Sequence, residues 1–151
     1  MVGECKESVG NRIITVVVAD DHHFTRSVVR DYINQSTDIR VVGEAASGME
    51  ALTQTHALHP DVLLLDMEMN GMSGIDVVRE LTHENQPQKS HIVALSAHND
   101  RQFILAVLDL GVDRYITKDE PIRVLVDAIR LIASRKAISH PRSTQQVSTT
   151  L

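Results

Sequence analysis

The chain has 151 residues, which suits one ordinary domain whose core forms without a disulfide or a structural metal. Its single cysteine, Cys5, excludes an internal disulfide framework and a cysteine-based zinc site. The net charge is −5, and residues 1–134 hold 12 basic and 20 acidic side chains, a balance of −8 that argues against nucleic-acid binding by the domain itself.

Five short apolar runs, mostly of β-branched residues, follow a polar N-terminus at 1–11 that we expect to be flexible. They cover residues 13–19, 39–45, 62–65, 92–95 and 115–117. Several lack alternation, which is typical of strands buried on both faces. Each run is followed by apolar residues at helical spacing, in stripes that begin at Phe24, Met49, Ile75, Phe103 and Ile122.

The alternation of strand and helix predicts an α/β fold of five βα units, with parallel strands and right-handed crossovers. Five units in about 120 residues favour an open, doubly wound five-stranded sheet over a barrel, which takes eight units and about 250 residues. We assign residues 12–135 to this domain. Residues 136–151 become rich in Ser, Thr and Gln and are predicted to be a linker or tail.

No apolar stretch approaches the ~20 residues that a membrane helix needs. Glu4, Lys6 and Glu7 interrupt any apolar run that could serve as a signal peptide. We therefore expect a cytoplasmic protein that does not contact a membrane.

Polar side chains stand where four of the five predicted strands end. Asp20 and Asp21 follow the first strand, Asp66 the third, Ser96 the fourth and Lys118 the fifth. Sites in open α/β sheets lie at the carboxyl ends of the strands. Three carboxylates, a hydroxyl and an ammonium are therefore expected to meet at the carboxyl edge of the sheet, in an opening that we call the mouth.

These residue types favour phosphoryl chemistry. Three neighbouring carboxylates repel one another unless a cation joins them, and oxygen ligands with room for water suit Mg²⁺. A carboxylate can attack phosphorus and form an aspartyl phosphate, while a metal and a lysine neutralise the transferring oxygens. The eight histidines of the chain show no spacing that assembles a ligand set, so we expect ordinary surface or helix-end roles for them.

Five short motifs, taken in order, resemble the receiver domain of bacterial two-component response regulators. They are Val-Val-Val-Ala-Asp-Asp-His at 16–22, Leu-Leu-Leu-Asp-Met-Glu-Met at 63–69, Gly74, Ala-Leu-Ser-Ala at 94–97 and Gly-Val-Asp-Arg-Tyr-Ile-Thr-Lys at 111–118. The resemblance covers roughly residues 12–134 and implies a flavodoxin-like sheet with strand order 2-1-3-4-5. The pair Lys118-Asp119 and the run from Leu125 to Arg130 resemble the NarL/FixJ (LuxR-type) subgroup.

The resemblance implies a role for each matched position around the phosphorylation site. Asp66 is the implied phosphoacceptor, and Asp66 and Asp21 are the implied direct ligands of Mg²⁺. Asp20 would reach the metal through water, and the backbone carbonyl of Glu68 would be a further ligand. Lys118 matches the lysine that binds the phosphoryl group.

Other matched positions concern the response to phosphorylation. Ser96 matches the catalytic switch hydroxyl that moves toward the phosphoryl group, and Tyr115 matches the aromatic residue that follows it. Glu68 and His98 match two variable positions that tune how fast the phosphoryl group is lost to water.

Two positions depart from the family pattern. Asn70, four residues after the implied phosphoacceptor, and Asp119, after the implied phosphate-binding lysine, stand where the family usually or often has proline. The pair Asn70-Gly71 is itself a good turn sequence, so we expect the loop to be kept with a different shape.

The implied function is that of a phosphoacceptor that takes its phosphoryl group from a sensor histidine kinase. It would catalyse only its own phosphorylation and slow dephosphorylation, without turning over a substrate. The conformational switch would be read on the face of the fourth helix, fifth strand and fifth helix, which is also the implied homodimer face. Transcription regulation and DNA binding would need a LuxR-type output domain that these 151 residues do not contain.

Two alternatives stay open at this point. The first is a stand-alone receiver that acts by binding protein partners. The second is an aspartate-nucleophile phosphatase, a class that carries Asp-x-Asp at its nucleophile where this chain has Glu68 in the second acidic position.

Overall fold

The computed structural model describes residues 12–85 and 89–136, which form five strands and five helices that alternate along the chain. The strands are β1 (Ile14–Ala19), β2 (Ile39–Ala45), β3 (Val62–Asp66), β4 (His91–Ser96) and β5 (Arg114–Thr117). The helices are α2 (His23–Asn34), α3 (Gly48–Leu58), α4 (Gly74–His83), α5 (Arg101–Asp109) and α6 (Ile122–Lys136). The predicted flexible N-terminus and residues 137–151 of the predicted tail lie outside the described residues.

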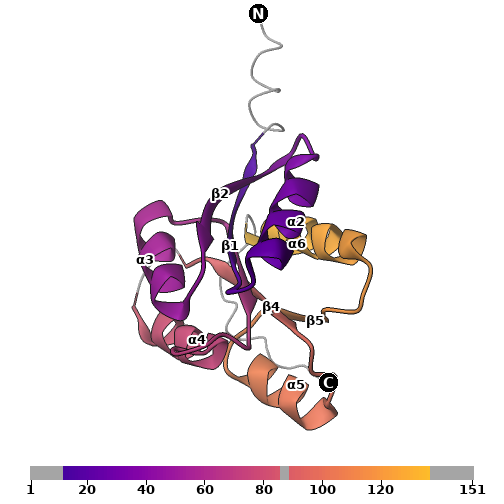
Figure 1. Ribbon diagram of the computed structural model, residues 1–151. Coiled ribbons are helices and arrows are strands. Elements are labelled where there is room, and N and C mark those ends of the chain that lie inside the picture. The colour runs from indigo at the N-terminus through magenta and orange to yellow at the C-terminus, as the bar shows by residue number, and fades with distance from the viewer. Residues whose placement is uncertain (1–11, 86–88, 137–151) are drawn as a thin grey trace, which may run out of the picture.

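The strands form one parallel sheet in the order β2-β1-β3-β4-β5, which confirms the predicted fold and strand order. Helices α2 and α6 cover one face of the sheet, and α3, α4 and α5 cover the other (Figure 1). Parallel strands need crossover connections, and helices on both faces bury the sheet completely. None of the described helices is long and apolar enough to cross a membrane.

The central strand β3 is buried along its whole length, so its side chains divide between two cores. Leu64 packs in the core beneath α2 and α6, whereas Leu63 and Leu65 pack in the core beneath the other three helices. Burying each such leucine stabilises the fold by roughly 1.5–3 kcal/mol. The strand ends on Asp66, which is therefore held at a fully buried point of the sheet's carboxyl edge.

Two of the five predicted helical stripes are wrong at their first residue, whereas Ile75, Phe103 and Ile122 pack against the cores as expected. Phe24 was expected on the apolar face of its helix, yet its side chain is 78% exposed, and Met49 is 62% exposed. Both residues lie in the first turn of their helix, where their side chains face solvent. Helical spacing places a residue on a face, but it does not show whether that turn has anything to pack against.

Asp61, just before β3, ties the beginning of that strand to the beginning of β1. Its Oδ2 accepts hydrogen bonds from the backbone N–H of Thr15 at 2.9 Å and from the Thr15 hydroxyl at 3.2 Å, and its Oδ1 lies 2.6 Å from Nη2 of Arg12. The Asp61 side chain is 4% exposed. Two polar groups of Thr15 would thus lose their acceptor if this carboxylate were removed.

We expect Asp61→Ala to lower the free energy of unfolding by about 1–3 kcal/mol, because it leaves the part-buried backbone N–H of Thr15 without its acceptor. Urea denaturation followed by circular dichroism measures this change. Asp31→Ala is the matched control, since the Asp31 side chain is 68% exposed and pairs only at the surface with Arg30. A loss for Asp61→Ala no larger than that of the control would contradict the structural role given to Asp61.

Candidate phosphorylation site

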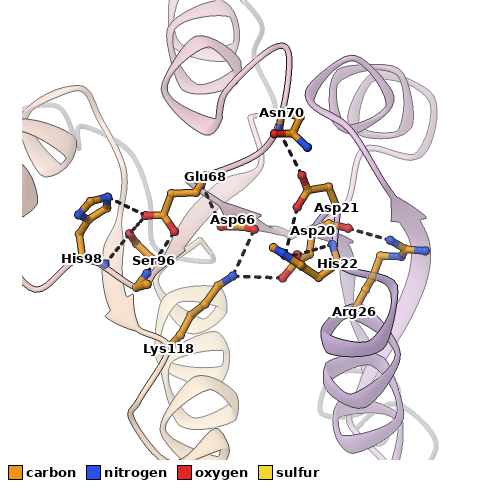
Figure 2. A network of polar contacts seen from close by, with 11 residues as sticks. Asp20, Asp21, His22, Arg26, Asp66, Glu68, Asn70, Ser96, His98 and Lys118 are labelled. Atoms are coloured by element: carbon orange, nitrogen blue, oxygen red, sulfur yellow. Dashed lines mark hydrogen bonds and ion pairs between the residues drawn. The ribbon is translucent and has the colours of Figure 1, made fainter.

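The carboxyl edge of the sheet brings together the polar side chains that the sequence placed at strand ends. Asp66 and Ser96 are the last residues of two adjacent strands, and the sheet pairs Asp66 with Leu95 and Ser96 with Thr117. Lys118 directly follows β5, and its backbone N–H donates to the carbonyl of Ser96 at 2.8 Å. Figure 2 shows these side chains facing one another together with the acidic pair that follows β1.

Asp66 has no solvent-exposed surface. Its Oδ1 accepts a hydrogen bond from the backbone N–H of Glu68 at 3.0 Å, and its Oδ2 lies 3.2 Å from Nζ of Lys118. Burial raises the pKa of Asp66 to about 6, and the charge of Asp20 adds to this rise, while the Glu68 N–H and Lys118 oppose it. The carboxylate is therefore costly to ionise where it stands and is stabilised by added positive charge.

Asp20 and Asp21 lie across the mouth from Lys118. Asp20 is 2% exposed; its Oδ1 accepts the backbone N–H of His22 at 2.9 Å, and its Oδ2 lies 3.5 Å from Nζ of Lys118. Oδ1 of Asp21 and Oδ2 of Asp66 are both buried, and neither has a hydrogen-bond partner within 12–85 and 89–136. Ligand atoms of Asp20, Asp21, His22 and Asp66 all lie within 4.8 Å of one another, a set that could hold a metal ion.

Lys118 bridges two of these carboxylates and is 26% exposed. Burial alone would lower the pKa of its ammonium, but the charges of Asp66 and Asp20 outweigh burial, and the pKa is raised. Lys118 therefore carries its positive charge at neutral pH. The peptide bond from Lys118 to Asp119 is trans, as are all bonds in the described residues, and Asp119 accepts a hydrogen bond from the Thr117 hydroxyl at 2.6 Å.

Asn70 makes a contact that the usual proline could not make. Its backbone N–H donates to Oδ2 of Asp21 at 3.1 Å, and proline has no N–H to donate. Gly71 follows with φ of +74°, the left-handed conformation that glycine adopts without strain. The loop after β3 therefore helps to fix the orientation of the Asp21 carboxylate.

Glu68 does not point its side chain at the acidic cluster but reaches the loop after β4 (Figure 2). Its Oε2 accepts a hydrogen bond from the Ser96 hydroxyl and lies 3.3 Å from Nε2 of His98. Its Oε1 accepts the backbone N–H of Ala97 at 3.3 Å. The Ser96 hydroxyl also accepts the backbone N–H of His98 at 3.0 Å, so Ser96 is held by Glu68 on one side and by its own loop on the other.

Tyr115 lies one step further from the carboxylates. Its hydroxyl donates to the backbone carbonyl of His98 at 2.8 Å, and burial raises the pKa of this hydroxyl. The Phe103 ring neighbours both residues, with ring centroids 4.8 Å from His98 and 6.2 Å from Tyr115. A continuous set of contacts thus runs from Glu68 through the loop after β4 to the face of α5 and β5.

Arg26 and His22 are parts of this site that the sequence analysis did not single out. Arg26 is 13% exposed and donates to the backbone carbonyl of Asp20 at 2.7 Å and to Glu44 at 3.1 Å, which fixes the acidic loop to β2. The sequence signal for His22 was its position next to Asp20 and Asp21. The spacing between histidines does not reveal it, because a single imidazole among carboxylates has no histidine partner. For Arg26 the sequence carries no comparable signal.

Comparisons with known proteins agree with one another. Residues 16–130 match the family model described as the response regulator receiver domain. The response regulator protein VraR from Staphylococcus aureus is 34% identical over 128 residues, which cover 85% of this chain and 60% of that protein. The chain therefore spans less than two thirds of the length of the curated relatives it matches.

Solved structures give the same result. A signal receiver domain of the response regulator NarL from Mycobacterium tuberculosis superposes with a TM-score of 0.76 at 32% identity, covering 82% of this chain and 98% of that one. A LuxR-family two-component response regulator from Aurantimonas sp. SI85-9A1 superposes with a TM-score of 0.75 at 27% identity, covering 81% of this chain and 86% of that one.

Proposed function

Since the chain belongs to the response regulator receiver domain family, and within it to the NarL/FixJ (LuxR-type) subgroup, we propose that Asp66 accepts a phosphoryl group from a sensor histidine kinase. The observation that carries this proposal is a fully buried carboxylate that stands 3.2 Å from a lysine ammonium and beside two further carboxylates. A structural carboxylate at a sheet end would not need a second and third acid next to it.

The residues fit a magnesium ion. Two buried carboxylate oxygens, Oδ1 of Asp21 and Oδ2 of Asp66, lack hydrogen bonds in the described part of the chain. The Lys118 ammonium lies 3.2 Å from the Asp66 oxygen, and a metal cation would add the positive charge that the remaining carboxylates need. We propose that Asp21 and Asp66 hold Mg²⁺ directly, that Asp20 holds it through water, and that the backbone carbonyl of Glu68 is a further ligand. When bound, the ion supplies charge neutralisation for the phosphoryl oxygens.

The side chains of the site have distinct roles in the transfer. A carboxylate oxygen of Asp66 forms the new bond to phosphorus as the bond from phosphorus to the kinase histidine nitrogen breaks. The Glu68 N–H holds Oδ1 of Asp66 and so orients the carboxylate. Lys118, charged and already within reach of Asp66, neutralises charge on the transferring group.

The switch is part of the same proposal. An aspartyl phosphate places roughly −1.5 to −2 charges next to Ser96, where the free carboxylate carried about −1, by analogy with other phosphorylated side chains. Ser96 would leave Glu68 and donate to the phosphoryl group, and Tyr115 would follow as the loop after β4 moves. Glu68 and His98 would tune dephosphorylation because they flank the path by which water reaches the phosphoryl group.

The output is proposed from the relatives rather than from this chain. The curated relatives are longer than the region matched here, which favours a LuxR-type DNA-binding domain, joined through the linker at 136–151, over a stand-alone receiver. The response regulators among the relatives likewise favour this function over a phosphatase. The proposal also includes a homodimer through the face of α5, β5 and α6. It further includes regulation of transcription and a cytoplasmic location.

Incubation with acetyl phosphate tests the proposed chemistry without a kinase. We expect Mg²⁺-dependent addition of one phosphoryl group, seen by intact mass, with peptide mapping after borohydride reduction placing it on Asp66. Excess EDTA should abolish the mass shift. Labelling that proceeds equally in EDTA, or that maps to another residue, would overturn the proposed function.

Lys118→Met should slow Mg²⁺-dependent labelling by about two orders of magnitude, because it removes a positive charge 3.2 Å from the phosphoacceptor carboxylate. The rate of the mass shift at fixed acetyl phosphate concentration measures this effect. Lys89→Met is the matched control, since Lys89 is exposed and lies at the opposite end of β4. If the two variants are labelled at similar rates, Lys118 has no part in the transfer.

A further inference from the structure

His22 lies close to the carboxylates of the site, although the spacing of the histidines along the chain does not point to it. Its Nδ1 is 3.3 Å from Oδ1 of Asp20 and 3.2 Å from Oδ1 of Asp21. These atoms belong to the set of four residues whose ligand atoms lie within 4.8 Å of one another. Figure 2 shows the His22 ring beside the two aspartates, on the side of the mouth opposite Glu68 and Ser96.

The position of the ring is not explained by the role of His22 in the helix. His22 is the N-cap residue of α2, but its side chain makes no capping hydrogen bond. Its backbone N–H donates to Asp20 instead, which anchors the residue beside the cluster. The side chain is 67% exposed, so packing does not force the ring toward the carboxylates.

A proton on Nδ1 of His22 could form a hydrogen bond to Asp20 but would leave other carboxylate oxygens of the cluster unsatisfied. Nδ1 has hydrogen-bond geometry toward Asp20, whereas Oδ1 of Asp21, at the shorter distance, is buried without a hydrogen-bond partner among the described residues. Oδ2 of Asp66 is likewise buried and without a hydrogen bond there, and it faces the Lys118 ammonium at 3.2 Å. One cation bound by the imidazole nitrogen and the carboxylate oxygens would satisfy all of these atoms together.

We propose that His22 Nδ1 is a metal ligand, which makes this a mixed nitrogen and oxygen site that binds first-row divalent transition ions such as Co²⁺, Ni²⁺ or Zn²⁺ in competition with Mg²⁺. Imidazole suits these ions, whereas Mg²⁺ prefers oxygen ligands alone. The inference rests on the proposed function only in that both ions share the carboxylates of Asp21 and Asp66. His22 therefore sets which metal the site selects.

Calorimetric titration of the whole chain with Co²⁺ and, separately, with Mg²⁺ tests this selectivity. In His22→Asn the ratio of the Co²⁺ to the Mg²⁺ association constant should fall at least about tenfold, because a single nitrogen ligand is lost from the transition-ion site only. The visible absorption bands of bound Co²⁺ should shift in the same variant, since they report the ligand set directly. An unchanged ratio with unchanged bands would overturn the proposal.

Two further variants separate this site from the other histidines of the chain. His23→Asn is the matched control: His23 is the exposed neighbour, lies outside the four-residue set and contacts Arg26, and its loss should leave the ratio and the bands unchanged. Asp21→Asn should weaken the binding of both ions. Co²⁺ binding that survives Asp21→Asn at full strength places the ion elsewhere and overturns the proposal.

The outcome is also distinguishable from failure of the proposed function. Wild-type protein that binds Co²⁺ through His22 but is not labelled by acetyl phosphate in Mg²⁺ would overturn the phosphoacceptor role and leave the metal inference standing. If wild-type protein is labelled normally and the ratio of the Co²⁺ to the Mg²⁺ association constant does not change in His22→Asn, the metal inference is overturned and the phosphoacceptor role stands.

Discussion

Asp66→Asn is expected to abolish Mg²⁺-dependent labelling by acetyl phosphate. An amide is not a nucleophile toward phosphorus under these conditions, and its oxygen gives the metal no negative charge. Asn keeps the size of Asp and can still accept the Glu68 N–H, so the loop after β3 should keep its conformation. Intact mass after incubation, together with circular dichroism of the variant, measures both effects.

The control for this substitution is Asp127→Asn, an acid on α6 whose side chain is 75% exposed. It removes the same charge from the molecule far from the mouth and should be labelled like the wild type. Labelling of Asp66→Asn that maps to Asp20 or Asp21 would show that a neighbouring carboxylate is the acceptor, and the assignment of Asp66 would then be wrong.

The sequence was sufficient for the sheet and for the meeting of the strand-end residues. Runs such as 62–65 are apolar without interruption because both faces of a parallel sheet are covered. This pattern does not depend on how the individual side chains pack. The extension of β3 to Asp66 and of β4 to Ser96 follows from backbone pairing across the sheet, which continues one residue beyond the apolar run.

What the sequence could not predict depends on loop geometry and on side-chain direction. The carboxylate of Glu68 reaches Ser96, 28 residues away, and the N–H of Asn70 reaches Asp21, 49 residues away. No periodicity or local spacing reports such contacts, because they exist only once the strand ends are side by side. The imidazole of His22 belongs to the same class, since its rotamer decides whether it meets solvent or the carboxylates.

The Glu68 contact changes how the switch is understood. The family resemblance gave Ser96 a move toward the phosphoryl group and gave Glu68 a separate tuning role. In the structure the Ser96 hydroxyl donates to Glu68, so these two roles compete for one hydroxyl. If Ser96 moves inward, its hydroxyl must give up the Glu68 carboxylate as acceptor and take a phosphoryl oxygen instead. His98 donates to the Ser96 hydroxyl and accepts from Tyr115, so both residues are linked to this move.

The cost of keeping Asp66 ionised should appear in the pH dependence of stability. The folded-state pKa of Asp66 is raised from 3.8 to about 6, mainly by burial. The folded protein therefore keeps a proton that the unfolded chain releases, and the stability that this proton confers is fully present below about pH 4 and is lost as the pH rises through 6. The shift corresponds to a loss of about 3 kcal/mol in the free energy of unfolding.

Urea denaturation in EDTA between pH 4 and pH 7.5 measures this loss, with Asp66→Asn as the reference. Other acids titrate in the same range; the pKa values of Asp38 and Glu44 are lowered by their arginine partners, so they add stability as the pH rises. The difference between wild type and variant cancels these contributions and leaves that of Asp66 together with its interactions with Asp20 and Lys118. We expect the variant to become the more stable protein above pH 6, and a difference that does not change with pH would contradict the raised pKa. When the site is empty and Asp66 is ionised, the buried charge destabilises the fold. Binding of a cation, or loss of the charge, should therefore stabilise the folded domain, so metal binding and stability are expected to be coupled.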